Sequence, residues 1–225
     1  MGRTQMNSKL VANRIERGFT LVELILALVI GIVLTAMAIP KLTSMTRAYR
    51  GIGDARSLSD MVSLAKLRAA AAFTDARVYA DTANSLYRVE IWNRSQSCWI
   101  TDGDTQCSAN YTSPATPPST SLSSGMTYGY GSLSSPPNNT QSTLRQAAQC
   151  QTDAQTLAQN AGNIANSACV VFNSRGVPVD NNWAATSNDA LYVSDGSEAY
   201  GVTVLATGLI QTWRAGLPSG AWINK

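Results

Sequence analysis

Histidine is absent from this 225-residue sequence. Its absence removes the commonest general base, the commonest side-chain metal ligand and every catalytic triad that contains an imidazole. Charged residues are also scarce, at 14% of the chain, while hydrophobic residues make up 44%. Ser, Thr, Asn and Gln replace the missing charges, which is common in proteins exported from the cytoplasm. The composition therefore disfavours most hydrolytic and metal-dependent enzymes.

Cysteine is absent from the first 97 residues, and the four cysteines that follow form no C-x-x-C pair. An even number of cysteines in an exported domain indicates disulfides. Three pairings are possible. We favour Cys98–Cys107 and Cys150–Cys169, because each bond closes a short loop.

The net charge of +3 is unevenly distributed. Residues 1–18 carry four basic side chains and one acidic side chain, and residues 41–77 carry seven basic and three acidic. Residues 78–225 carry six basic and nine acidic side chains. Phosphate neutralisation requires clustered Lys and Arg. The acidic balance of residues 78–225 therefore makes nucleic acid an unlikely main partner.

Residues 19–39 form a run of 21 residues that is almost entirely apolar. As a helix rising ~1.5 Å per residue it would be ~30 Å long, enough to cross a bilayer core. Arg14 and Arg17 precede it. The positive-inside rule then predicts a single span with residues 1–18 in the cytoplasm and the remainder outside.

Two features separate this run from an ordinary signal peptide. A signal peptide is cut after its apolar region at small residues, whereas here the small residue, Gly18, precedes that region. Cleavage there would remove the charged leader and retain the helix. The second feature is Glu23, because a carboxylate inside a membrane helix is costly and usually marks function. A new α-amine at Phe19 would be a natural charge partner for Glu23, within its own chain or in a neighbour.

The sequence from Gly18 through Glu23 to Pro40 resembles the N-terminus of type IV pilins and type II secretion pseudopilins. The resemblance implies that a prepilin peptidase cuts after Gly18 and methylates the new N-terminal Phe19. It implies that Glu23 pairs with the N-terminus of an adjacent subunit during assembly, and that Pro40 is the helix-breaking proline of the family.

Residues 41–80 are predicted to continue the helix as an amphipathic segment, with apolar residues at three- and four-residue steps. Gly51 and Gly53 interrupt the pattern, and each costs about 1 kcal/mol in a helix interior. We expect a kink or a melted turn there, or a flexible break without a role.

Residues 81–225 are predicted to form a β-rich head. Residues 108–168 are rich in Ser, Thr, Pro and Gln, and we interpret them as a surface excursion, tethered by Cys150, with a short helix at 144–158. The predicted strands are residues 86–92, 98–101, 127–130, 168–172, 190–193, 199–205 and 209–213.

One long helix followed by many strands predicts an α+β, pilin-like fold in which the helix packs on an antiparallel sheet. Residues 171–178, with Phe172 and Gly176, and the final hairpin, with Thr207-Gly208 at its tip, resemble the ending of GspH/FimT-type minor pilins and pseudopilins. Such subunits are thought to lie near the filament tip. The long excursion at 108–168 departs from the compact members of that group.

Other candidate sites have simpler explanations. Gly129-Tyr-Gly131 lacks the third glycine of a dinucleotide site. Asp81, Asp102 and Asp104 do not have calcium-loop spacing and fit solvated turns. The five tryptophans fit core and edge packing better than a glycan surface. The basic residues of the helix continuation fit a solvated face with one or two subunit salt bridges; they are Arg47, Arg50, Arg56, Lys66, Arg68 and Arg77.

The sequence therefore predicts a structural minor pilin or pseudopilin, not an enzyme, with no cofactor and no metal. The expected partners are the prepilin peptidase, other subunits bound through the N-terminal helix, and the inner-membrane assembly platform. The expected location is the bacterial inner membrane with the head in the periplasm, followed by incorporation into a pilus or pseudopilus. The alternative is a DNA-binding subunit for DNA uptake, which rests on Arg214 and Lys225 of the final segment.

Overall fold

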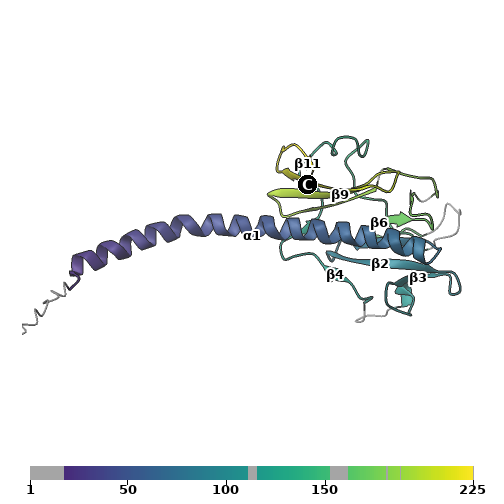
Figure 1. Cartoon of the computed structure of the whole chain (residues 1–225), viewed down its shortest axis with the longest axis horizontal. Helices are drawn as coiled ribbons and strands as arrows, with labels where there is room; N and C mark the ends of the chain where they lie inside the picture. Colours follow the sequence, from purple (N-terminus) through teal and green to yellow (C-terminus); the bar gives the residue numbers. More distant parts are fainter. Residues whose placement is uncertain (1–17, 111–115, 153–161, 181, 188, 225) are drawn as a thin grey trace, which may run out of the picture. The chain divides into compact units, whose positions relative to one another are not determined.

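The computed structural model describes residues 18–110, 116–152, 162–180, 182–187 and 189–224. The chain divides into two compact units, residues 1–44 and residues 45–225 (the head), which are described separately below. Figure 1 shows the elements of the head, which combines one helical segment with antiparallel strands. The α+β prediction is confirmed.

Helix α1 (Leu21–Ala71) is continuous through Gly51 and Gly53, so the predicted melted turn does not occur. The helix ends nine residues before the predicted boundary at residue 80. Phe73 adopts a left-handed backbone, with φ at 50°, directly after the last turn. The chain then enters strand β1 (Ala76–Asp81), in which Ala76, Val78 and Ala80 alternate with polar side chains. The four alanines before Phe73 fit a helical pattern, so the sequence pattern did not indicate that the helix ends there and a strand follows.

The strands of the described residues form two antiparallel sheets. Sheet A has the order β3 (Cys98–Thr101), β2 (Leu86–Asn93), β1, β6 (Ser167–Phe172) and β7 (Pro178–Val179), and β4 (Thr120–Ser121) also pairs with β2. Sheet B has the order β11 (Ile223–Asn224), β10 (Ile210–Gly216), β9 (Glu198–Val204), β8 (Asp189–Ser194) and β5 (Thr127–Tyr128). Each predicted strand is present within a few residues. The prediction missed β1 and the two-residue strands β4, β7 and β11.

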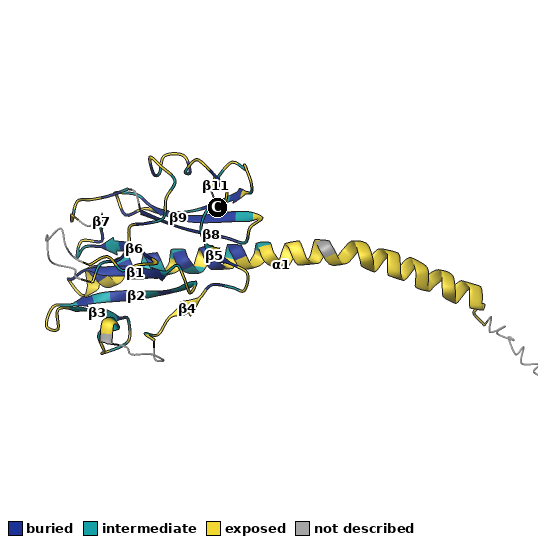
Figure 2. Ribbon diagram, turned by 180° about the vertical axis from the view of Figure 1, so that it is seen from behind, coloured by how far each residue is buried: buried dark blue, intermediate teal, exposed yellow. Residues whose placement is uncertain are grey.

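One core joins the helical segment of the head to both sheets (Figure 2). The helix contributes a narrow stripe of small and medium side chains at three- and four-residue steps: Ala55, Leu58, Val62, Ala65 and Ala69. Sheet A contributes the inner faces of β1, β2 and β6, and sheet B those of β8 and β9. Because alanine projects little beyond the backbone, the helix can approach the sheets closely.

Residues 146–151 connect the two sheets. The N–H of Ala147 donates to the carbonyl of Ala190 in β8 (2.7 Å), and the N–H of Cys169 in β6 donates to the carbonyl of Ala148 (2.8 Å). The Gln146 side chain also accepts a hydrogen bond from the Tyr192 N–H and donates to the Tyr192 carbonyl. This segment therefore supplies partners for backbone groups of Cys169 in β6 and of Ala190 and Tyr192 in β8.

The excursion at 108–168 is thus part of the fold and more than a surface decoration. Its Leu122, Met126 and Ala147 lie in the core, and Asp54 of the helix accepts hydrogen bonds from the N–H and hydroxyl of Ser123. The predicted helix at 144–158 is wrong for residues 144–152, which contain no helix. Residues 153–158 lie outside the described residues. Both favoured disulfides, Cys98–Cys107 and Cys150–Cys169, are confirmed.

Gly51 has a packing role. A Cβ at this position would lie 2.2 Å from the Tyr200 ring, whereas a Cβ at Gly53 would meet no atom within 4 Å. Tyr200 is itself fixed, because its ring is buried and its hydroxyl contacts the Ala48 carbonyl and the Glu198 carboxylate. The ring therefore has little room to move away from a new methyl group.

The two glycines allow a matched test of this packing. Gly53→Ala should stabilise the head by up to about 1 kcal/mol, because it only improves helix propensity. Gly51→Ala gains the same propensity but displaces Tyr200, so it should destabilise the head by about 1–3 kcal/mol. Chemical unfolding followed by near-UV circular dichroism measures both changes. Equal stabilisation by the two substitutions would contradict the close approach of Tyr200.

Candidate processing and assembly segment

Residues 18–20 lie outside helix α1, and Thr20 caps its first turn. The Thr20 Oγ1 atom accepts a hydrogen bond from the Glu23 N–H (3.2 Å), and the Thr20 carbonyl accepts one from the Leu24 N–H (3.2 Å). This satisfies N–H groups that have no partner within the helix. The Gly18–Phe19 peptide bond is thereby left in non-helical chain two residues before the first helical residue.

The first part of α1 exposes apolar side chains on every face. Phe19 is 83% exposed, and all described side chains from Phe19 to Ile39 are exposed (Figure 2). By length and composition, α1 is the helix of the described residues that could cross a membrane. A helix that is apolar all round must be covered by lipid or by other protein. Glu23 is the acidic residue of its first turn.

Gly18 and Phe19 thus lie directly before the exposed first turn of α1, which contains Glu23. Cleavage after Gly18, methylation of Phe19 and the assembly role of Glu23 stay predictions. Pro40 lies inside α1, which continues past it, so the expected break at this proline does not occur. Because proline has no N–H, the Ala36 carbonyl receives no intrahelical hydrogen bond from residue 40.

In the head, Arg77, Arg88 and Glu90 form a cluster of charges. Arg77 is 3% exposed and Glu90 is fully buried. Glu90 accepts hydrogen bonds from Arg77 Nε (2.6 Å) and Arg88 Nε (2.7 Å), one on each carboxylate oxygen. Burial alone would raise the pKa of Glu90, but the two guanidinium groups outweigh it and hold the pKa below its usual value.

This cluster is closed to ligands. Arg77 Nη1 donates to the Gln151 carbonyl (2.6 Å), and its guanidinium lies 4.0 Å from the centre of the Trp99 ring. The Arg88 guanidinium lies 3.9 Å from the centre of the Tyr79 ring. Each charge therefore has a partner, and the excursion covers the cluster. We interpret it as structural.

The remaining candidates are also structural. Asp81 and Asp104 accept N–H groups of their own turns, and Asp102 pairs with Arg68 at 2.8 Å. Among the described residues there is no group of three potential metal ligands. Trp92 and Trp99 are buried with their ring centres 5.4 Å apart, and the half-buried Trp183 packs against them. Core packing is thus confirmed for these tryptophans.

Lys66 connects the two turns of the C-terminal pattern. Its Nζ donates to the Gly208 carbonyl (3.0 Å), and its aliphatic chain lies next to Gly176. A Cβ at Gly208 would lie 2.9 Å from the Gly176 carbonyl. Three of the six basic residues that were assigned to a solvated face, Lys66, Arg68 and Arg77, therefore have specific partners within the head.

Residues 13–39 match the family described as the prokaryotic N-terminal methylation motif. None of the curated proteins matches the chain. Two solved structures of the minor pseudopilin EpsH from the type II secretion system of Vibrio cholerae are similar, each with 12% identity and a TM-score of 0.40. The alignments cover 72% and 74% of this chain and 95% and 94% of those chains.

Glu90→Gln tests the charge cluster. It leaves two buried guanidinium groups without a counter-charge, so it should cost about 3–5 kcal/mol of unfolding free energy at pH 7. Glu198→Gln is the control, because Glu198 and its partner Arg214 are both partly exposed to water, so the substitution should cost about 1 kcal/mol or less.

The stability difference between the wild type and Glu90→Gln should also depend on pH. Because the pKa of Glu90 is lower in the folded protein, its stabilisation is present above about pH 4 and is lost as the pH falls through the folded value. The difference between the wild type and Glu90→Gln should therefore shrink below about pH 4. A difference that stays constant from pH 7 to pH 3 would contradict the buried ion pairs.

Proposed function

We propose that this chain, which carries the N-terminal methylation motif of type IV pilins and pseudopilins, is a structural subunit of a type IV filament machine. The machine is a type IV pilus or a type II secretion system. The observation that carries the proposal is the exposed apolar helix whose first turn contains Glu23 and follows Gly18–Phe19. A soluble monomer would leave these apolar side chains in water.

Processing would begin at the cap of α1. Peptidases bind their substrates in extended backbone, and Thr20 holds the Gly18–Phe19 bond outside the helix. Cleavage would release the basic leader and leave a new α-amine on Phe19. It would then be one turn from the Glu23 carboxylate.

Assembly would be favoured because the Glu23 carboxylate is energetically unfavourable in lipid. Before assembly the helix lies in the bilayer, where Glu23 lacks water. Transfer of the apolar surface from lipid to neighbouring helices gains little by itself, because both surroundings are apolar. Pairing Glu23 with the N-terminal amine of the next subunit would therefore set the register of the filament. The head would supply the contacts that select the neighbours.

Membrane orientation follows from charge. Four basic residues and one acidic residue precede the apolar run, which favours a cytoplasmic leader and a periplasmic head. The two disulfides fit an oxidising compartment. The same segment would meet the peptidase and the assembly platform in the inner membrane.

We further propose a minor subunit near the filament tip, where it would act in the initiation of assembly. The GspH/FimT-like turns around Gly176 and Gly208 support this proposal, because Lys66 holds them together at one end of the head. The alternative of DNA uptake has less support. Arg214, on which it rests, pairs with Glu198 through Nε at 3.0 Å, and Lys225 lies outside the described residues.

Gly18→Leu should block leader cleavage, because a bulky side chain would stand beside the scissile bond. Intact mass and N-terminal sequencing of the protein from native membranes should show a chain that begins at methylated Phe19 for the wild type. The variant should retain its leader. Gly31→Leu is the control, since Gly31 lies on an open face of the same helix and should leave cleavage unchanged. A wild-type chain that begins near Met1 would refute the proposed function.

Glu23→Gln should separate processing from assembly. The amide keeps the size of the side chain but loses its charge, so cleavage should be normal and incorporation into filaments should fall at least tenfold. Fractionation of sheared filaments and membranes, with immunodetection, measures the distribution. Thr35→Ser is the control, and its distribution should match that of the wild type. Normal incorporation of Glu23→Gln would exclude a register role for the carboxylate.

A further inference from the structure

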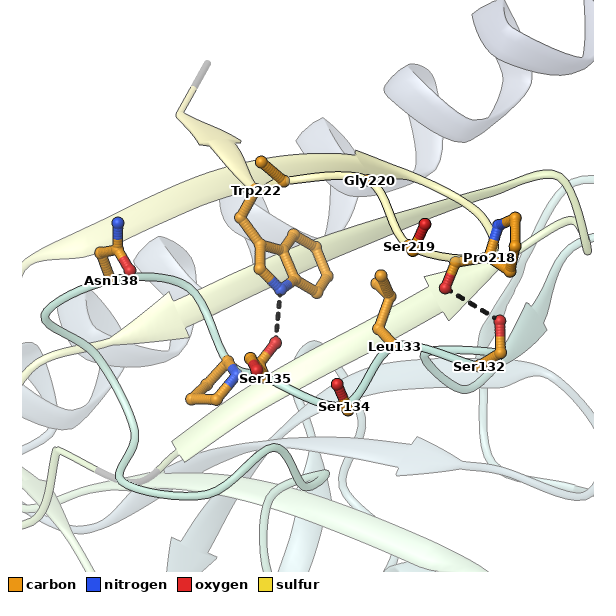
Figure 3. Close-up of a pocket in the computed structure, with 11 residues that line it drawn as sticks. Ser132, Leu133, Ser134, Ser135, Asn138, Pro218, Ser219, Gly220 and Trp222 are labelled. Carbon is orange, nitrogen blue, oxygen red and sulfur yellow. Dashed lines mark hydrogen bonds between the residues drawn. The ribbon is translucent and has the colours of Figure 1, made fainter.

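A pocket of about 380 Å³ lies on the head between the loop at residues 132–138 and the turn at residues 218–222 (Figure 3). Its volume is within the range of small-molecule sites. It belongs to neither the processing segment nor the charge cluster.

The pocket is uncharged and rich in polar groups. None of its lining residues is Asp, Glu, Lys or Arg, so nothing in the lining selects an anion or a cation. Its polar groups are serine hydroxyls, one amide and backbone groups, which both donate and accept hydrogen bonds. They come from Ser132, Ser134, Ser135, Asn138, Ser219 and Gly220.

Trp222, Pro136 and Pro218 add apolar surface to the same lining. The indole of Trp222 is held in place from two sides. Its Nε1 donates to the Ser135 carbonyl (2.8 Å), and its ring centre lies 5.4 Å from that of the buried Tyr192. Figure 3 shows the ring between the loop and the turn, next to Ser135.

The two walls are preorganised. The Ser132 hydroxyl donates to the Pro218 carbonyl (3.2 Å), which joins the loop to the turn. Leu133 is buried against Ala199 and Ala215 of sheet B. Gly220 closes a tight turn in which a Cβ would lie 2.5 Å from the Gly216 carbonyl. A ligand would therefore find the walls already in place, which reduces the ordering cost of binding.

We propose that this pocket binds a neutral sugar unit of a glycan. A sugar ring presents hydroxyl groups at its edge and apolar C–H groups on its faces. The serine and asparagine groups match the edge, and the indole and prolines match the faces. An ionic ligand would lack a counter-charge in the pocket, and a wholly apolar ligand would leave its polar groups without partners. The proposal does not depend on the filament role.

Binding can be tested on the full chain in phosphocholine micelles, because detergents with sugar head groups would compete. The probes are maltose and N,N′-diacetylchitobiose as neutral sugars, and glucuronic acid as a charged sugar of similar chemistry. Saturation-transfer NMR and tryptophan fluorescence report binding. At least one neutral disaccharide should bind saturably in the millimolar range, and glucuronic acid should bind at least tenfold more weakly.

Two substitutions assign the binding to this pocket. Ser134→Phe should fill it and weaken binding at least tenfold, whereas Ser142→Phe, at an exposed position outside the pocket lining, should leave binding unchanged. Trp222→Ala should weaken binding to a similar extent, and near-UV circular dichroism checks that each variant is folded. The proposal is overturned if neither disaccharide binds, if glucuronic acid binds equally well, or if Ser134→Phe and Ser142→Phe bind alike.

Discussion

Helix α1 buries only a narrow stripe in the head, whereas every described side chain from Phe19 to Ile39 is exposed. The first part cannot be stable in water by itself, because burial of apolar surface is the main favourable contribution to folding. The stripe in the head is the complementary case. The side chains of the stripe pack against both sheets. The other faces of this part of the helix do not have to be apolar. The two parts of one helix thus satisfy different surroundings.

The head depends on how closely the helix approaches the sheets. Gly51 leaves room for the Tyr200 ring, and the alanines of the stripe belong to the same core as alanines of β1 and β6. Two polar contacts of the helix also hold loops of the head in place. Asp54 holds the loop at Ser123, and Lys66 holds the hairpin tip at Gly208. The helix is therefore the axis that positions both sheets.

The excursion completes the head in two ways. Residues 146–151 hydrogen-bond backbone groups of β6 and β8, and Gln151 closes the cluster of Arg77 and Glu90. The loop at 132–138 forms one wall of the uncharged pocket. A segment of low sequence complexity can do this because it supplies backbone and hydroxyl hydrogen bonds, for which no apolar periodicity is needed.

The sequence by itself determined the N-terminal segment and most of the strands. A basic segment, a glycine, a long apolar run and a glutamate lie close together along the chain, so the sequence alone is enough to recognise the pattern. Alternation predicted β2, runs of strand-forming residues predicted β8, β9 and β10, and short loop length favoured both disulfides.

Only the tertiary structure decided the end of α1, the role of Gly51, the partners of Lys66 and Arg77, and the pocket at Trp222. Each of these depends on residues distant in the chain. Gly51 meets Tyr200, Lys66 meets Gly208, and Trp222 meets Ser135. A local pattern records which face of an element is apolar, but it does not record which distant backbone will come to lie against it.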